Sequence, residues 1–140
     1  MQPRPGLLQD LGFYRSVFAV AAAYDLILGL AFIFLYNPIL DVLDIAEPYN
    51  TSYIHLAAVF VAVQGIGYLF VWQDVAGNAG LVKTGIIYKA AYAGVAIYYL
   101  AIGDLLHWVF FVFGMLDLVF LVLFVGALRA IRSHQVGGGR

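Results

Sequence analysis

The feature of the sequence that most constrains the fold is an apolar run, Ala79–Gly103, with a lysine, Lys89, near its middle. A run of this length crosses the hydrocarbon core of a bilayer, about 30 Å thick, as one helix of about 20 residues. A cation at the bilayer centre costs about 2.5–3.5 kcal/mol on insertion scales, so such a residue normally faces a bundle interior and meets an opposite charge. The run therefore predicts a membrane-spanning helix and a buried partner for Lys89.

The composition favours lipid as the surrounding solvent. Hydrophobic residues make up 64% of the chain and charged residues only 11%, against about 25% charged in an ordinary soluble domain. The absence of cysteine excludes disulfides, thiolate metal sites and cysteine nucleophiles. The net charge of −1 argues against a nucleic-acid partner, and the lipid bilayer is the expected partner.

Apolar runs of spanning length occur four times and predict an all-α protein, a four-helix up-down transmembrane bundle. The expected spans are residues 14–36, 53–72, 80–102 and 107–128. Residues 1–13 are expected to form a cytoplasmic or interfacial segment, and residues 129–140 a basic cytoplasmic tail. The tail contains the glycine run Gly137-Gly138-Gly139.

The first connection between spans, Asn37–Ser52, carries a helical pattern of its own. Asn37 suits an N-cap, Pro38 suits the first helical position and Pro48 marks an end. Apolar residues recur at helical spacing between them, with the acidic residues on the other side. This predicts a short amphipathic helix on the outer membrane surface; the alternative is a solvated acidic loop.

The distribution of basic residues predicts the orientation. Arginine or lysine flanks the N-terminus, the second connection and the end of the last span, whereas the first and third connections have none. Cytoplasmic loops carry the excess of these residues, so both termini are expected on the cytoplasmic side of an inner (plasma) membrane. Aromatic residues expected at the two interfaces are Tyr36, Tyr49, Tyr53, Tyr98, Tyr99 and Trp108 outside, and Tyr14 and Trp72 inside.

Each predicted span carries one polar or charged residue near its middle: Asp25, Gln64, Lys89 and Asp117. At 1.5 Å rise per residue, all four lie within about 4 Å of one plane. Each shares a helical face with small residues, which let helices approach closely in lipid. Asp25 shares its face with Ala22 and Gly29, Gln64 with Gly67, Lys89 with Gly85 and Ala93, and Asp117 with Gly114. We therefore expect the four side chains to converge in a buried midplane network.

Four tyrosines lie near the same depth: Tyr24, Tyr68, Tyr88 and Tyr92. Tyr68 and Tyr92 share the polar faces and would extend the network, although some tyrosines must simply pack. Lys89 neutralises only one of the two aspartates. Three interpretations of the midplane network are open. It is a fully hydrogen-bonded network that fixes helix register, a site for protons or ions, or a site for a ligand.

Two histidines offer a different chemistry. His55 and His107 lie just inside the outer ends of their spans, where they could ligate a haem or, with Asp104 or Glu47, a metal. The simpler interpretation is interfacial histidines bonded to headgroups or backbone. No nucleotide fingerprint and no serine nucleophile elbow occur, so no cofactor and no enzymatic activity are expected.

Short motifs in the second half resemble a known group of proteins. They are Gly65-x-Gly67-Tyr68, Gly85-x-x-x-Lys89, Tyr98-Tyr99-x-x-x-Gly103 and Leu116-Asp117-Leu118-x-Phe120. Over residues 53–128 the chain resembles small uncharacterised bacterial four-span membrane proteins, distantly similar to the DoxX-like group. The resemblance implies a bacterial four-helix membrane protein and assigns no functional residue.

The combined expectation is a small polytopic membrane protein acting as a non-catalytic accessory or interaction subunit. Other membrane subunits or further copies of the chain would be its protein partners. The alternatives are a small proton- or ion-coupled transporter built on Asp25, Lys89 and Asp117, and a haem- or quinone-linked membrane oxidoreductase component.

Overall fold

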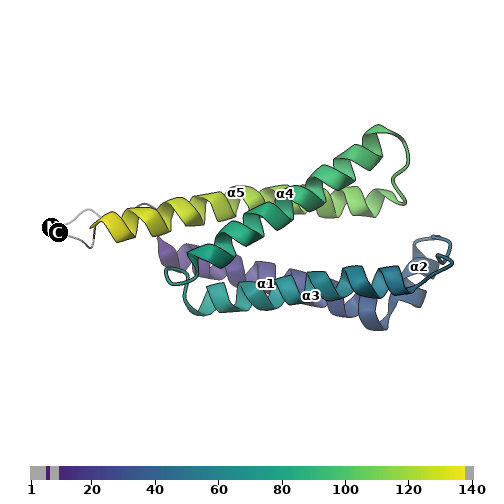
Figure 1. Cartoon of the computed structure of the whole chain (residues 1–140), viewed down its shortest axis with the longest axis horizontal. Coiled ribbons are helices and arrows are strands. Elements are labelled where there is room, and N and C mark those ends of the chain that lie inside the picture. Colours follow the sequence, from purple (N-terminus) through teal and green to yellow (C-terminus); the bar gives the residue numbers. More distant parts are fainter. Residues whose placement is uncertain (1–5, 7–9, 138–140) are drawn as a thin grey trace.

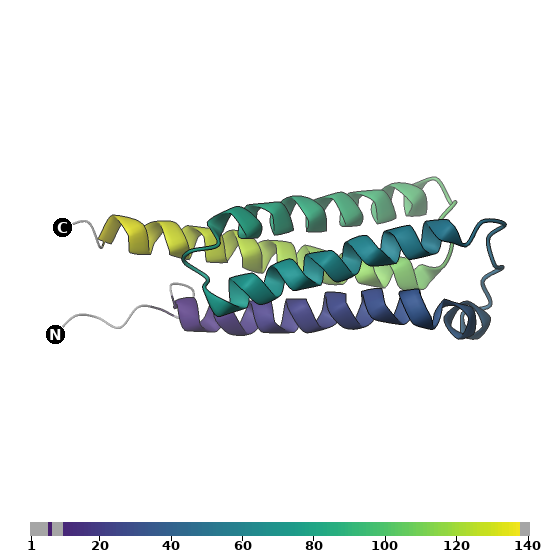
Figure 2. The same cartoon turned by 60° about the horizontal axis from the view of Figure 1, so that its bottom comes forward.

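The structure is a computed structural model that describes residue 6 and residues 10–137 of the chain. These residues form five α-helices and no strand: α1 (Leu11–Phe34), α2 (Tyr36–Val42), α3 (Ser52–Gln73), α4 (Ala79–Ala101) and α5 (Trp108–Gly137). The predicted all-α class is confirmed. The four long helices run alongside one another, and the start of α1 and the end of α5 lie at the end of the molecule opposite α2 (Figures 1 and 2).

Three of the long helices, α1, α3 and α5, are long and apolar enough to cross a membrane. α4 is of similar length, with 23 residues, but Lys83, Lys89 and its tyrosines make it less apolar. Large apolar side chains are exposed on all four helices, among them Ile27, Phe60, Ile87 and Val122. Apolar exposure on this scale is typical of a surface that meets lipid or protein.

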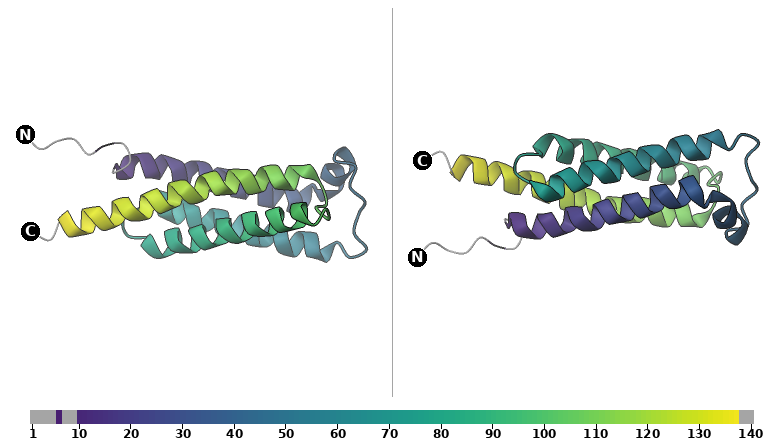
Figure 3. Two further views of the ribbon diagram at one scale, coloured as in Figure 1. Left: turned by 90° about the horizontal axis from the view of Figure 1, so that it is seen from above. Right: turned by 90° about the horizontal axis from the view of Figure 1, so that it is seen from below.

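The ends of the helices differ from the predicted spans. α1 begins at Leu11, where the Asp10 carboxylate caps the helix by accepting a hydrogen bond of 2.8 Å from the Gly12 amide. α5 continues to Gly137 and projects beyond its neighbours (Figure 3), so most of the expected tail is helical. Residues 1–5, 7–9 and 138–140 lie outside the described residues, and with them much of the predicted N-terminal segment and of the glycine run.

The predicted short helix in the first connection is present as α2, but its predicted start is wrong. The N-cap is Leu35, and Asn37 lies within the helix. Pro38 has no amide hydrogen to donate to Phe34, which explains why the α1 hydrogen-bond ladder ends there. The chain leaves the helix after Val42, and Leu40 and Ile45 turn inward while the acidic residues of the connection stay exposed.

The long helices pair as two hairpins, because α1 packs mainly on α3 and α4 mainly on α5. Two glycines allow the α1–α3 approach: a Cβ at Gly29 would lie 2.6 Å from the Ala62 nitrogen, and one at Gly65 would lie 2.9 Å from the Leu26 nitrogen. The expectation that Gly67 serves this purpose is wrong, since it has open space around it. Close backbone contact of this kind is a common basis of helix association in lipid.

The two hairpins are in contact most extensively in the half of the molecule near the termini. Phe18 of α1 stacks on Phe124 of α5 at 4.4 Å, and Tyr68 of α3 meets Phe124 edge-on at 5.0 Å. Tyr14 is 1% exposed within this core, so its expected place in an interfacial belt is wrong. Towards α2 the hairpins diverge (Figure 1).

Candidate functional site

The centre of the molecule holds a buried group of three charged residues, Asp25, Lys89 and Asp117, here called the ionic triad. The ammonium nitrogen of Lys89 lies 2.8 Å and 3.1 Å from the two carboxylate oxygens of Asp25 and donates hydrogen bonds to both. It also lies 2.8 Å from Oδ1 of Asp117. Lys89 is 0% exposed, Asp25 1% and Asp117 4%.

Each member of the ionic triad comes from a different helix: Asp25 from α1, Lys89 from α4 and Asp117 from α5. The contact of Lys89 with Asp117 is therefore internal to the second hairpin, whereas its contact with Asp25 joins the two hairpins. Small residues flank Lys89 and Asp117 along the α4–α5 contact, where a Cβ at Gly114 would touch that of Ala96 at 3.1 Å. The close packing places the lysine within reach of both carboxylates.

Four aromatic rings surround the lysine and form what we call the aromatic cage: Tyr24, Tyr68, Tyr88 and Phe120. The ammonium nitrogen lies between 5.2 and 5.6 Å from each ring centroid. Within about 6 Å, the face of an aromatic ring attracts a cation, and more so where water is excluded. The cage thus adds stabilisation for the charge on Lys89 beyond the two carboxylates.

Some buried polar groups of the site have regular hydrogen bonds and others do not. Oδ1 of Asp117 is paired with Lys89 by distance but lacks regular hydrogen-bond geometry, unlike Asp25. The buried hydroxyls of Tyr24 and Tyr68 also lack a regular hydrogen bond to any described residue. With two carboxylates and one ammonium, the ionic triad holds one more acidic group than basic groups. Its polar groups are therefore not fully matched.

The predicted network members divide into two groups. Asp25, Lys89 and Asp117 come together, whereas Gln64 is half-buried and stands apart from them, its side chain approaching Tyr68 from one turn earlier on α3. Tyr68 joins the aromatic cage, and Tyr92 instead lines a cavity beside it. Phe120 was not predicted, although its position three residues after Asp117 places it on the same face of α5.

An apolar cavity of about 370 Å³ lies between the hairpins in the half of the molecule near α2. Its walls come from α1, from the α2 connection, from α3 and from α5, and Tyr92 of α4 contributes one side. Tyr92 follows Lys89 by one helical turn, so the cavity begins close to the ionic triad. The site thus separates a tightly packed half of the molecule from a more open half.

The two histidines take part in local contacts. His107 accepts a hydrogen bond of 3.1 Å from the Val109 amide through Nδ1, and His55 meets the ring of Tyr36 edge-on at 5.0 Å. In the part of the chain that the structure describes, no three histidine, aspartate or glutamate side chains gather as metal ligands.

Comparison of the chain with known protein families, with curated proteins and with solved structures finds no match. A lysine enclosed by two carboxylates and four rings is held in one position. Such an arrangement can clamp helices together, and it can exchange a proton through its surplus carboxylate.

Proposed function

We propose that the chain is a four-span integral membrane protein that acts as a non-catalytic accessory or interaction subunit, held in shape by the ionic triad. The observation that carries this proposal is the complete enclosure of Lys89 between carboxylates of both hairpins. A charge used in this way holds helices in register and does not face a substrate. A bacterial inner membrane and a relationship to DoxX-like proteins belong to the same proposal.

A spanning position for α4 is supported by its partners. The cost of placing Lys89 in lipid is offset by the two carboxylates it meets, so its charge does not exclude the helix from the membrane. Lys83 lies near the start of α4, where its long side chain can reach the interface. α4 also packs along α5 for much of its length.

The charge distribution supports cytoplasmic termini. Among the described residues, the arginines and lysines outside the ionic triad lie at the end of the molecule where α1 begins and α5 ends: Arg15, Lys83, Arg129 and Arg132. At the other end, the charged residues of the connections are all acidic: Asp41, Asp44, Glu47 and Asp104. Positive charge on the cytoplasmic side is the usual determinant of orientation.

Labelling of single cysteines tests the four-span topology, because the chain has none of its own. Ala76→Cys and Gln135→Cys are expected to react with a membrane-impermeant maleimide only from the cytoplasmic side. Glu47→Cys and Asp104→Cys are expected to react only from the other side. Labelling of Ala76→Cys and Asp104→Cys from the same side would show that α4 does not span and would refute the topology.

The accessory role is tested by purification in mild detergent with quantitative analysis of the recovered proteins. A second membrane protein recovered in near-equal amount with the chain, and absent from a mock purification, is expected. Repeated recovery of the chain alone would count against this role.

A small proton- or ion-coupled carrier is the second candidate. It is favoured by the surplus carboxylate of the ionic triad and by the cavity that begins one turn from Lys89. Asp117→Asn and Lys89→Met are expected to abolish proton-coupled flux in proteoliposomes, with Lys83→Met as the control. Unchanged flux in both variants would exclude this candidate.

A further inference from the structure

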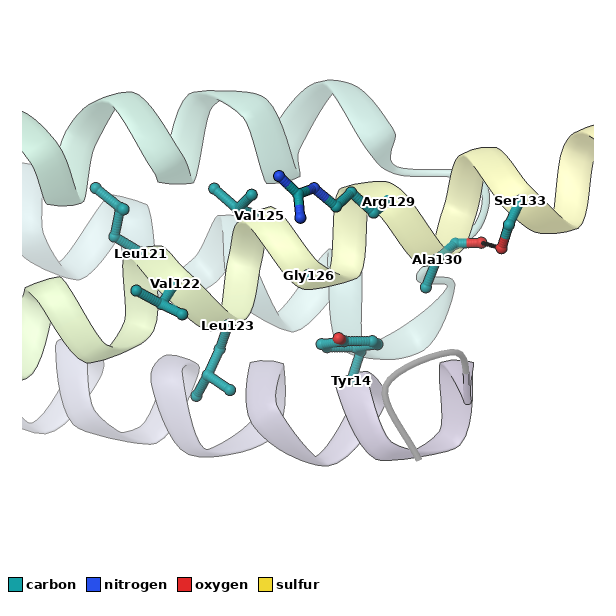
Figure 4. Close-up of a pocket in the computed structure, with 9 residues that line it drawn as sticks. All are labelled: Tyr14, Leu121, Val122, Leu123, Val125, Gly126, Arg129, Ala130 and Ser133. Atoms are coloured by element: carbon teal, nitrogen blue, oxygen red, sulfur yellow. Dashed lines mark hydrogen bonds between the residues drawn. The ribbon is translucent and has the colours of Figure 1, made fainter. Parts of the chain in front are cut away.

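A groove of about 740 Å³ runs along α5 near the termini. Figure 4 shows its floor and sides: aliphatic side chains of α5 at one end, and Tyr14 of α1, Arg129 and Ser133 at the other. The aliphatic residues that line it are Leu121, Val122, Leu123 and Val125. From Leu121 to Arg129 the helix rises about 12 Å, so the groove has the length of a segment of acyl chain.

Arg129 gives the groove a single fixed charge. It is exposed, and no ion pair joins it to any residue that the structure describes. Its guanidinium group extends along α5 above Val125 (Figure 4). The other lining residues carry no charge, so the groove combines one cation with an aliphatic floor.

The shape of the groove depends on Gly126. A Cβ at this position would collide with the hydroxyl of Tyr14, so only glycine lets the tyrosine ring lie this close to α5. Tyr14 thereby forms a wall from α1 opposite Gly126, and the guanidinium group of Arg129 lies between this level and Val125 (Figure 4). Along α5, in chain order, the aliphatic side chains of the groove come first and the basic residue Arg129 follows them.

We propose that this groove binds one anionic phospholipid of the leaflet next to the termini. The phosphate group is held by Arg129, and an acyl chain lies along Leu121–Val125. A guanidinium group matches a phosphate through paired donors, and the cytoplasmic leaflet supplies anionic lipids to basic residues at its surface. The proposal rests on the topology given under Proposed function.

The test uses the full chain purified from membranes in mild detergent and native mass spectrometry with added phosphatidylglycerol or phosphatidylcholine. We expect the wild-type chain to retain phosphatidylglycerol in preference to phosphatidylcholine. Arg129→Gln is expected to reduce retained phosphatidylglycerol about fivefold. The control is Arg132→Gln, which removes an exposed charge from the same helix outside the groove and is expected to change retention less than about twofold.

A second pair of variants tests the aliphatic part without changing charge. Val125→Trp fills the groove and is expected to lower retention of phosphatidylglycerol, whereas Val119→Trp, on an exposed part of α5 outside the groove, is expected to keep it. Equal loss in Arg129→Gln and Arg132→Gln, equal retention of the two lipids, or undiminished retention by Val125→Trp would each overturn the proposal.

Failure of the lipid proposal and failure of the four-span topology can be distinguished. Cysteine labelling reports whether α4 spans the membrane, whatever lipid is bound. The comparison of Arg129→Gln with Arg132→Gln reports on the groove in protein already recovered from the membrane. Correct topology with no difference between these variants would therefore refute only the lipid site.

Discussion

Lys89 donates two hydrogen bonds, of 2.8 and 3.1 Å, to the carboxylate of Asp25, which lies 64 residues earlier in the chain. This contact joins α4 to α1 and so connects the two helical hairpins. Asp117 pairs with the same ammonium group from within the second hairpin. The ionic triad therefore combines one contact that links hairpins with one that stabilises a single hairpin.

Replacing Lys89 by methionine should destabilise the protein by about 3–5 kcal/mol, because two buried carboxylates lose the ammonium group that they share. Combining Lys89→Met with Asp25→Asn or Asp117→Asn should recover part of this loss, since less negative charge is left buried. Thermal unfolding in detergent measures the change. The control is Lys83→Met, an exposed lysine on the same helix, expected to change stability by less than about 0.5 kcal/mol. Additive losses in both double variants would contradict direct pairing.

Asp25→Asn should cost more stability than Asp117→Asn. The first change leaves one acceptor oxygen in place of the two that accept hydrogen bonds from Lys89 across the hairpins, and it removes the negative charge. The second leaves Lys89 paired with the Asp25 carboxylate and removes the surplus carboxylate. Hydrogen bonds to a charged group contribute about 1.5–3 kcal/mol, so a difference of at least about 1 kcal/mol is expected. Unfolding of the two variants side by side measures it, and the reverse order would show that Asp117 is the main partner.

Gly29→Ala should destabilise the α1–α3 contact, because its Cβ would lie 2.6 Å from the Ala62 backbone nitrogen and the helices would have to separate. A loss of about 1–3 kcal/mol is expected, in the range of overpacking. The matched control is Gly67→Ala, on α3 with open space around it, which should be neutral or stabilise by up to about 1 kcal/mol. Similar changes in stability in both variants would show that the close approach at Gly29 carries no cost of its own.

Tyr68→Phe should leave stability nearly unchanged or raise it by about 1 kcal/mol, because the hydroxyl it removes is buried without a regular hydrogen bond. Tyr68→Leu should cost about 2 kcal/mol or more, since it removes a ring beside Lys89 and the packing on Phe18 and Phe124. The two variants are compared by thermal unfolding. A large loss in Tyr68→Phe would mean that the hydroxyl has a strong partner, with Gln64 as the first candidate.

Much of this molecule is determined by the sequence alone. The apolar runs determine the helical class, and helical rise places Asp25, Lys89 and Asp117 at similar depth, because distance along a helix follows directly from residue number. The apolar runs and the residue spacing do not determine how each helix is rotated about its own axis.

That rotation is decided by contacts between helices. The close approach at Gly29 and Gly65 positions α1 on α3, and packing around Phe124 buries Tyr14, Phe18 and Tyr68. As a result Lys89 meets both aspartates and Gln64 meets neither. Residue spacing predicts which side chains lie at one depth. Which of them are in contact depends on the packing of neighbouring helices, and this packing involves residues far apart in the chain.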